Sequence, residues 1–192
     1  MQSRLIAIGA VQTPDFQPGF SYMTPVEIGG RIPDTLNRWS HAIAVALGLC
    51  GLKTGTAWVT LDEKALESGQ VHRRPGPHMD GNYRQGAWGV DGWKGYDQRG
   101  GLFLLASAEG ARAWTGDIPG EPTPWNFEGA DGKPSDGGDC AHMDLRGMKQ
   151  HRLLPNVLYW MNSCGIHESI PVHAPVNRSL MRLTLPHYCP QL

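Results

Sequence analysis

Residues 167–185 read His-Glu-Ser-Ile-Pro-Val-His-Ala-Pro-Val-Asn-Arg-Ser-Leu-Met-Arg-Leu-Thr-Leu, and this stretch decides the fold. The prolines at 171 and 175 predict a loop, because proline interrupts regular backbone hydrogen bonding. The run 178–185 follows this loop and predicts a strand. A histidine, a connecting loop and a strand headed by an arginine therefore follow one another, with Arg178 eleven residues after His167.

The rest of the chain supports a mainly β protein with flanking N-terminal helices. The content of 25 Gly and 15 Pro in 192 residues favours many turns between short strands. Leu36, Trp39, Ile43 and Leu47 share one helical face and predict a helix over 34–48. A second, short helix is predicted over 62–68. The predicted strands cover 5–11, 58–61, 70–80, 101–106, 111–114, 156–162 and 178–185.

Composition and charge exclude several classes of protein. The net charge of −1 and a pI near 6.7 argue against nucleic acid or anionic lipid as the main partner. No apolar run approaches the ~18 residues that a membrane helix needs, so no membrane partner is expected. The four cysteines are scattered, without the paired spacing of a zinc site or the density of a disulfide scaffold. We expect a cytoplasmic protein with reduced thiols.

One segment differs in composition from the rest of the chain. Residues 115–147 hold seven acidic against two basic residues, with seven glycines and four prolines. A long segment of this kind inside a domain is typically a functional lid or a disordered loop. The expected organisation is a single domain over 1–192, in which 1–69 supports a β core at 70–185 that carries this insert.

Two identical tripeptides, His78-Met79-Asp80 and His142-Met143-Asp144, present candidate metal ligands. On a strand, residues i and i+2 point to the same side, so each tripeptide places an imidazole beside a carboxylate. Such a pair supplies two of the three ligands of a two-histidine, one-carboxylate metal site. The third ligand must then be a histidine from a distant part of the chain.

Here the sequence resembles the Fe(II)/2-oxoglutarate-dependent dioxygenases, most closely their prolyl-hydroxylase-like branch. The segment 167–180 is similar to that branch's histidine, loop, arginine and strand. Gly100-Gly101, followed by Leu-Phe-Leu, resembles the family's glycine-rich strand between its ligand motifs. The resemblance covers roughly residues 70–185. It implies a double-stranded β-helix, or jelly-roll, dioxygenase core.

The resemblance also implies the site residues. His78, Asp80 and His167 would be the catalytic metal ligands, and Arg178 would bind the distal carboxylate of 2-oxoglutarate. Arg182, on the same strand face, is a second candidate for that carboxylate. His173 is a rival distal ligand, nine residues before Arg182, but it lies in the predicted loop.

Spacing favours the first tripeptide as the ligand pair. Four strands must fit between the family's ligand motifs, at typically ~5–6 residues each plus turns. Asp80 and His167 are separated by 86 residues, whereas Asp144 and His167 are separated by only 22. We therefore interpret His142 and Asp144 as part of an exposed lid, with a second metal site as the alternative.

The implied activity is hydroxylation of an unactivated C–H bond, with Fe(II) as the metal, 2-oxoglutarate as cosubstrate and O₂ as oxidant. The expected substrate is a small molecule or a peptidyl residue such as proline, with a nucleobase as a further candidate. The alternative is a non-catalytic or zinc-binding, cupin-like barrel that binds a small ligand.

Further cavity candidates are Trp88, Trp93, Tyr83 and Tyr159. The run His72-Arg73-Arg74 is interpreted as a solvated strand edge. The sequence does not determine the oligomeric state.

Overall fold

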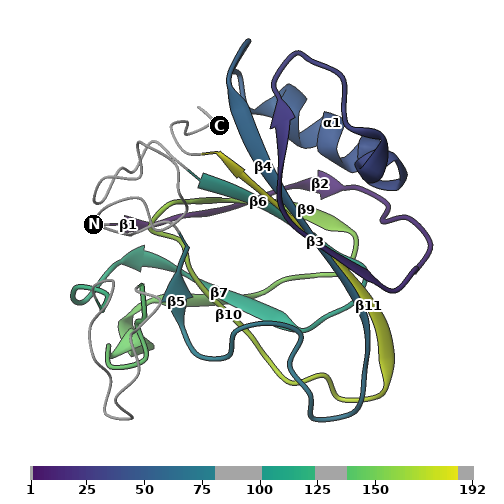
Figure 1. The fold of residues 1–192 in the computed structure, drawn as a ribbon. Coiled ribbons are helices and arrows are strands. Elements are labelled where there is room, and N and C mark those ends of the chain that lie inside the picture. Colours follow the sequence, from purple (N-terminus) through teal and green to yellow (C-terminus); the bar gives the residue numbers. More distant parts are fainter. Residues whose placement is uncertain (1, 81–100, 124–137, 186–192) are drawn as a thin grey trace.

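Two antiparallel sheets and one α-helix form the described part of the protein (Figure 1). The structure, a computed structural model, describes residues 2–80, 101–123 and 138–185. In spatial order, the larger sheet consists of β2 (Leu5–Ala10), β9 (Val157–Asn162), β6 (Gly101–Ala106), β11 (Val176–Leu185), β4 (Thr56–Leu66) and β3 (Gly19–Glu27).

The smaller sheet faces one side of the larger one. Its order is β1 (Gln2–Ser3), β7 (Ala111–Asp117), β10 (Ile166–Ser169) and β5 (His78–Met79), with β8 (Lys149–Arg152) also paired to β7. A short 3₁₀ turn, η2 (Leu145–Gly147), precedes β8. Apolar side chains of β6, β9 and β11 pack against those of β7 between the sheets. Two facing antiparallel sheets are consistent with the predicted jelly roll.

Strand β11 lies between β4 and β6 in the larger sheet, and it contributes side chains to the hydrophobic clusters on both faces of that sheet. Side chains alternate across a strand, so its two faces have different surroundings. Leu180 belongs to the cluster between the sheets, whereas Met181 and Leu183 belong to the cluster under the helix. Arg178 and Arg182 are each two positions from Leu180, so their side chains point to the same face of β11 as Leu180. Both arginines therefore face the space between the sheets.

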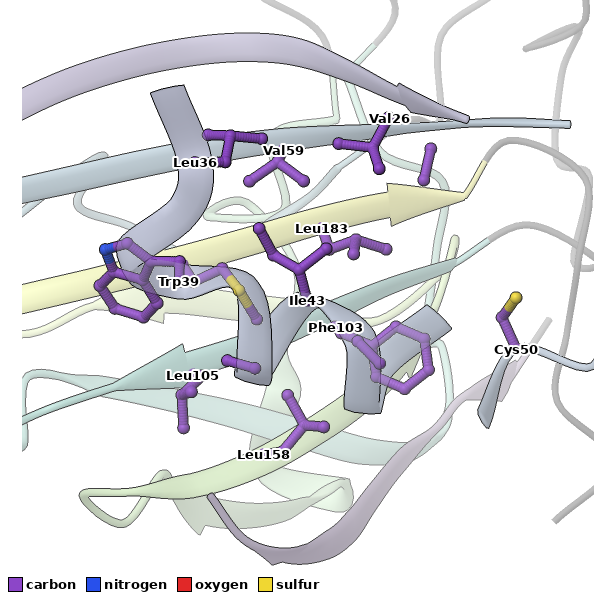
Figure 2. Close-up of a cluster of buried hydrophobic side chains, with 14 of the residues drawn as sticks. Val26, Leu36, Trp39, Ile43, Cys50, Val59, Phe103, Leu105, Leu158 and Leu183 are labelled. Atoms are coloured by element: carbon purple, nitrogen blue, oxygen red, sulfur yellow. The ribbon is translucent and has the colours of Figure 1, made fainter. Parts of the chain in front are cut away.

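The predicted N-terminal helix covers the outer face of the larger sheet (Figure 1). It consists of a 3₁₀ turn, η1 (Asp34–Trp39), followed by α1 (Ser40–Leu49). Figure 2 shows Leu36, Trp39 and Ile43 packed toward side chains of the sheet, and all three are buried. Trp39 Nε1 also donates a hydrogen bond to Glu63 Oε2 at 3.2 Å, which attaches the helix to β4.

The prediction of a second helix over 62–68 was wrong. Within residues 2–80, 101–123 and 138–185, α1 is the one α-helix. Strand β4 instead continues to Leu66 and pairs with β11 along this stretch. Local propensity favoured a helix there, but the hydrogen-bonding edge of β11 requires a strand. Because β2, β3 and β4 all pair within the larger sheet, residues before 70 build part of the β-structure themselves.

The predicted strand over 70–80 is also shorter than expected. Only His78 and Met79 are in a strand, and 67–77 forms turns and irregular backbone. Within the described ranges, no helix combines the length and the apolar character needed to cross a membrane.

We expect Ile43→Ala to lower the free energy of unfolding by about 2–5 kcal/mol, because it removes buried methyl groups and leaves a cavity. Ile43 is fully buried between α1 and the larger sheet. Chemical denaturation measures the loss, and Leu154→Ala is a suitable control because Leu154 is 53% exposed. An equal loss in both variants would contradict this packing.

Candidate metal centre

Two histidines meet where β5 and β10 pair. His78 lies directly opposite His167 in the antiparallel register, and residues in such pairs project on the same side of the sheet. Their ring centroids are 4.6 Å apart. The strand pairing therefore brings together two imidazoles that are 89 positions apart in the chain.

Each ring is held by a backbone carbonyl oxygen two residues earlier in the chain. His78 Nδ1 lies 2.8 Å from the Gly76 carbonyl oxygen, and His167 Nδ1 lies 3.0 Å from that of Gly165. A carbonyl oxygen only accepts hydrogen bonds, so each Nδ1 carries the proton. In the neutral form of such a ring, Nε2 presents its lone pair. Such support from outer hydrogen bonds is what orients histidine ligands in metal sites.

Asp80 completes the cluster. Its Oδ1 lies 3.9 Å from His78 Nε2, and its Oδ2 lies 3.6 Å from His167 Nε2. One potential ligand atom from each of the three residues lies within 4.8 Å of the others, and all three side chains are buried. Within residues 2–80, 101–123 and 138–185 this is the one such group. The structure therefore brings together the three ligands predicted from the sequence.

The electrostatics keep this cluster ready to bind a cation at neutral pH. Burial, reinforced by the neighbouring His167, lowers the pKa of His78 to about 4, so its ring is neutral. Burial raises the pKa of Asp80, but the opposing contacts, chiefly the ion pair with Arg182, hold this pKa well below its ordinary value. Neutral imidazole and ionised carboxylate are the forms that bind metals.

Arg182 lies directly on the candidate metal centre. Its Nη1 is 2.6 Å from Asp80 Oδ2, and both side chains are almost completely buried. Tyr22 on β3 lies against the same guanidinium; burial raises the pKa of Tyr22, and Arg182 partly opposes this shift. In this structure Arg182, the second candidate for the cosubstrate carboxylate, is an ion-pair partner of a candidate metal ligand. No pattern in the sequence pointed to Tyr22.

We expect Arg182→Met to destabilise the protein strongly when a chelator keeps it free of metal, and much less when a divalent ion is bound. Loss of the guanidinium leaves the Asp80 carboxylate buried without its cation, a change that typically costs about 3–5 kcal/mol. A metal ion at the same carboxylate replaces the lost positive charge. Thermal unfolding with EDTA and with Mn²⁺ measures the difference. Arg146→Met, which breaks an exposed pair with Asp144, is the control and should change little. Equal destabilisation with and without metal would contradict this role.

Arg178, four residues earlier on β11, has a different environment. It is 1% exposed, and burial lowers the pKa of its guanidinium to about 10, so it stays charged at pH 7. Its Nε donates to the Ala108 carbonyl oxygen at 3.0 Å, and its Nη1 lies 2.7 Å from His72 Nδ1. A side chain at Gly110 would approach Arg178 Nε to 3.0 Å, in a backbone conformation (φ +141°) that favours glycine.

His72 is therefore not at a solvated strand edge. It is 1% exposed and lies between Arg178 and Asp62, so this interpretation of the run 72–74 was wrong. The contacts come from strands β4 and β11, and no local sequence pattern connects them to residue 72.

The other candidates that the structure describes have partners elsewhere in the fold. His173 is exposed in the β10–β11 loop, where its carbonyl oxygen accepts a hydrogen bond from Ser68. His142 is near the surface, bound to the Glu121 carbonyl oxygen. Asp144 is exposed and caps η2 through the Arg146 amide. Tyr159 packs between the sheets and accepts a hydrogen bond from the Leu154 amide. Tyr83, Trp88, Trp93 and positions 124–137 of the acidic insert lie outside the described residues.

Comparison with known proteins supports the fold. No protein-family model and no curated protein matches the sequence. A solved structure of EvdO2 from Micromonospora carbonacea var. aurantiaca, complexed with 2-oxoglutarate, matches with a TM-score of 0.50 and 13% identity, over 85% of this chain and 67% of that one. The non-heme alpha ketoglutarate dependent epimerase SnoN from nogalamycin biosynthesis gives a TM-score of 0.44 at 13% identity, over 99% and 71% of the two chains. The likeness to EvdO2 is one of fold, and it does not assign the chain to the prolyl-hydroxylase-like branch.

Proposed function

We propose that this protein is an Fe(II)- and 2-oxoglutarate-dependent enzyme that oxidises a C–H bond of its substrate, with hydroxylation as the expected reaction. The observation that carries the proposal is the cluster of His78, Asp80 and His167, with a buried arginine on the same inner face of the fold. The fold likeness to EvdO2, which was solved with 2-oxoglutarate, supports it.

The donor set suits iron. Two imidazole nitrogens and one carboxylate form the facial arrangement that leaves adjacent coordination positions free on Fe(II). His78, Asp80 and His167 would hold the metal, and the iron with 2-oxoglutarate and O₂ would supply the oxidising chemistry that side chains lack. The two Nδ1–H···O=C hydrogen bonds fix which ring nitrogen faces the metal.

Arg178 suits the other end of the cosubstrate. A guanidinium presents parallel N–H donors that match both oxygens of a carboxylate. Along β11, Arg178 and Arg182 are four positions apart, which corresponds to about 13 Å of extended strand. Leu180 faces the same interior between the two arginines. Unlike Arg182, which is paired with Asp80, Arg178 is held by Ala108 and His72, and it would receive the distal carboxylate of the diacid.

Spectroscopy under anaerobic conditions tests the proposal. Addition of Fe(II) and then 2-oxoglutarate should give a visible charge-transfer band, and admission of O₂ should yield succinate. A colourless mixture that forms no succinate in air would favour the cupin-like binding module, with Zn²⁺ as the natural metal for the same ligands. A panel of free amino acids, nucleosides and proline-containing peptides then defines the substrate by the stimulation of succinate release.

A further inference from the structure

A buried chain of three polar side chains extends from β4 to the candidate cosubstrate site. Asp62 on β4 has its Oδ1 3.2 Å from His72 Nε2, and His72 Nδ1 lies 2.7 Å from Arg178 Nη1. All three side chains are at least nine-tenths buried. Asp62 and Arg178 belong to paired strands, and His72 reaches them from the loop that follows β4.

The chemistry of these groups fixes the state of His72. A guanidinium donates hydrogen bonds and cannot accept them, so His72 Nδ1 must present its lone pair to Arg178. The neutral ring then carries its proton on Nε2, which faces the Asp62 carboxylate. A protonated ring would lose the acceptor and place a second positive charge beside Arg178. The contact therefore requires neutral imidazole, and burial, the main cause, lowers the pKa of His72 in that direction.

The charged groups around His72 are consistent with this arrangement. On β11 it faces Arg178, and on β4 it faces Asp62 and, further away, Lys64. Asp62 also has Arg73 Nη1 at 3.3 Å and Lys64 Nζ at 3.7 Å from its Oδ2. Burial raises the pKa of Asp62, but His72 and these cations outweigh it, so the carboxylate stays ionised. An ionised Asp62 keeps the proton of His72 on Nε2.

This row of buried side chains restricts the orientations that the Arg178 guanidinium can adopt. A guanidinium has five N–H donors, and a flexible side chain must be held in place if it is to meet a carboxylate with two of them. Arg178 is restrained on one edge by the Ala108 carbonyl oxygen and at Nη1 by His72. These two contacts leave the remaining Nη protons for an incoming carboxylate.

We propose that His72 and Asp62 are positioning residues that orient Arg178 for the distal carboxylate of 2-oxoglutarate. This inference rests on the proposed function. It assigns a role to two residues that need not touch iron or substrate. Their effect should therefore appear in cosubstrate affinity and leave metal affinity unchanged.

The first test is the affinity of the intact protein for 2-oxoglutarate, measured anaerobically with Fe(II). We expect His72→Leu to raise the dissociation constant at least about tenfold, because it removes a hydrogen bond to a charged group. His72→Asn should stay within about threefold of wild type, since its amide oxygen can occupy the place of Nδ1. His151→Asn is the control, because His151 is a partly buried histidine on β8 that does not contact Arg178. Fe(II) affinity should be the same in all four proteins.

The second test does not depend on cosubstrate and remains valid if His72→Leu fails to fold. Ring ¹⁵N NMR of the wild-type protein should show His72 neutral at pH 7 with its proton on Nε2, and the His72→Asn spectrum assigns the signal. A charged ring, or a proton on Nδ1, would overturn the positioning role.

The two hypotheses fail in different ways. If wild-type protein does not bind 2-oxoglutarate at all, the proposed function and this inference both fail. If wild type binds it and His72→Leu binds it equally well, the positioning role alone fails and the proposed function stands.

Discussion

His167→Ala is expected to lower 2-oxoglutarate turnover below about one hundredth of the wild-type rate, because substitution of outer hydrogen-bond partners alone can cost 10–100-fold. The variant should still fold, since Asp80 keeps its ion pair with Arg182 when the imidazole is removed. Succinate formation and Fe(II) affinity measure the effect. His173→Ala, at the rival histidine in the exposed β10–β11 loop, should retain both. If His167→Ala kept its activity and His173→Ala lost it, the distal ligand would be His173 and not His167.

The corresponding test at Asp80 needs a more careful substitution. Alanine at this position would leave the Arg182 guanidinium buried without its carboxylate, and the resulting loss of stability would obscure the loss of metal. Asp80→Asn keeps an oxygen for Arg182 but removes the negative charge that a divalent ion requires. We expect it to fold and to lose iron-dependent turnover. If it keeps most 2-oxoglutarate consumption, the ligand pair is wrong, and His142 and Asp144 should be substituted next.

The second large effect is expected at Arg178. Arg178→Ala should weaken 2-oxoglutarate binding by about two orders of magnitude or more, since loss of one partner of a buried, hydrogen-bonded charge pair costs about 2–5 kcal/mol. Arg178→Lys should weaken it less, because it keeps the charge but loses the paired donors and the contact with His72. Neither change should remove iron, since Arg178 does not contact the three candidate ligands.

Anaerobic titration of 2-oxoglutarate against these variants measures the effect. Arg146→Ala, at an exposed arginine, is the control for loss of positive charge. Denaturation of each variant separates weakened binding from weakened folding, because Arg178 is almost completely buried. If Arg182→Ala gives the larger loss of 2-oxoglutarate affinity while its iron affinity is unchanged, the cosubstrate anchor is Arg182.

The sequence by itself determined the features that depend on short-range spacing. The helix over 34–48 follows from apolar residues three and four positions apart, and the structure has η1 and α1 there. His78 and Asp80, two positions apart, belong to one cluster, and the order of histidine, loop and arginine strand matches β10 and β11. Period and spacing are properties of the local chain, so they can be read without knowledge of the fold.

Only the tertiary structure decided which long-range partner each polar side chain has. Arg178 and Arg182 share a strand face. Spacing alone could not show that Arg182 contacts Asp80 and that Arg178 contacts His72. Residues 62–66 form a strand because β11 lies beside them, although their local pattern predicted a helix. In each case the deciding contact joins strands or loops far apart in the chain. The energy of a buried ion pair or of a strand edge depends on these distant partners, which no local pattern encodes.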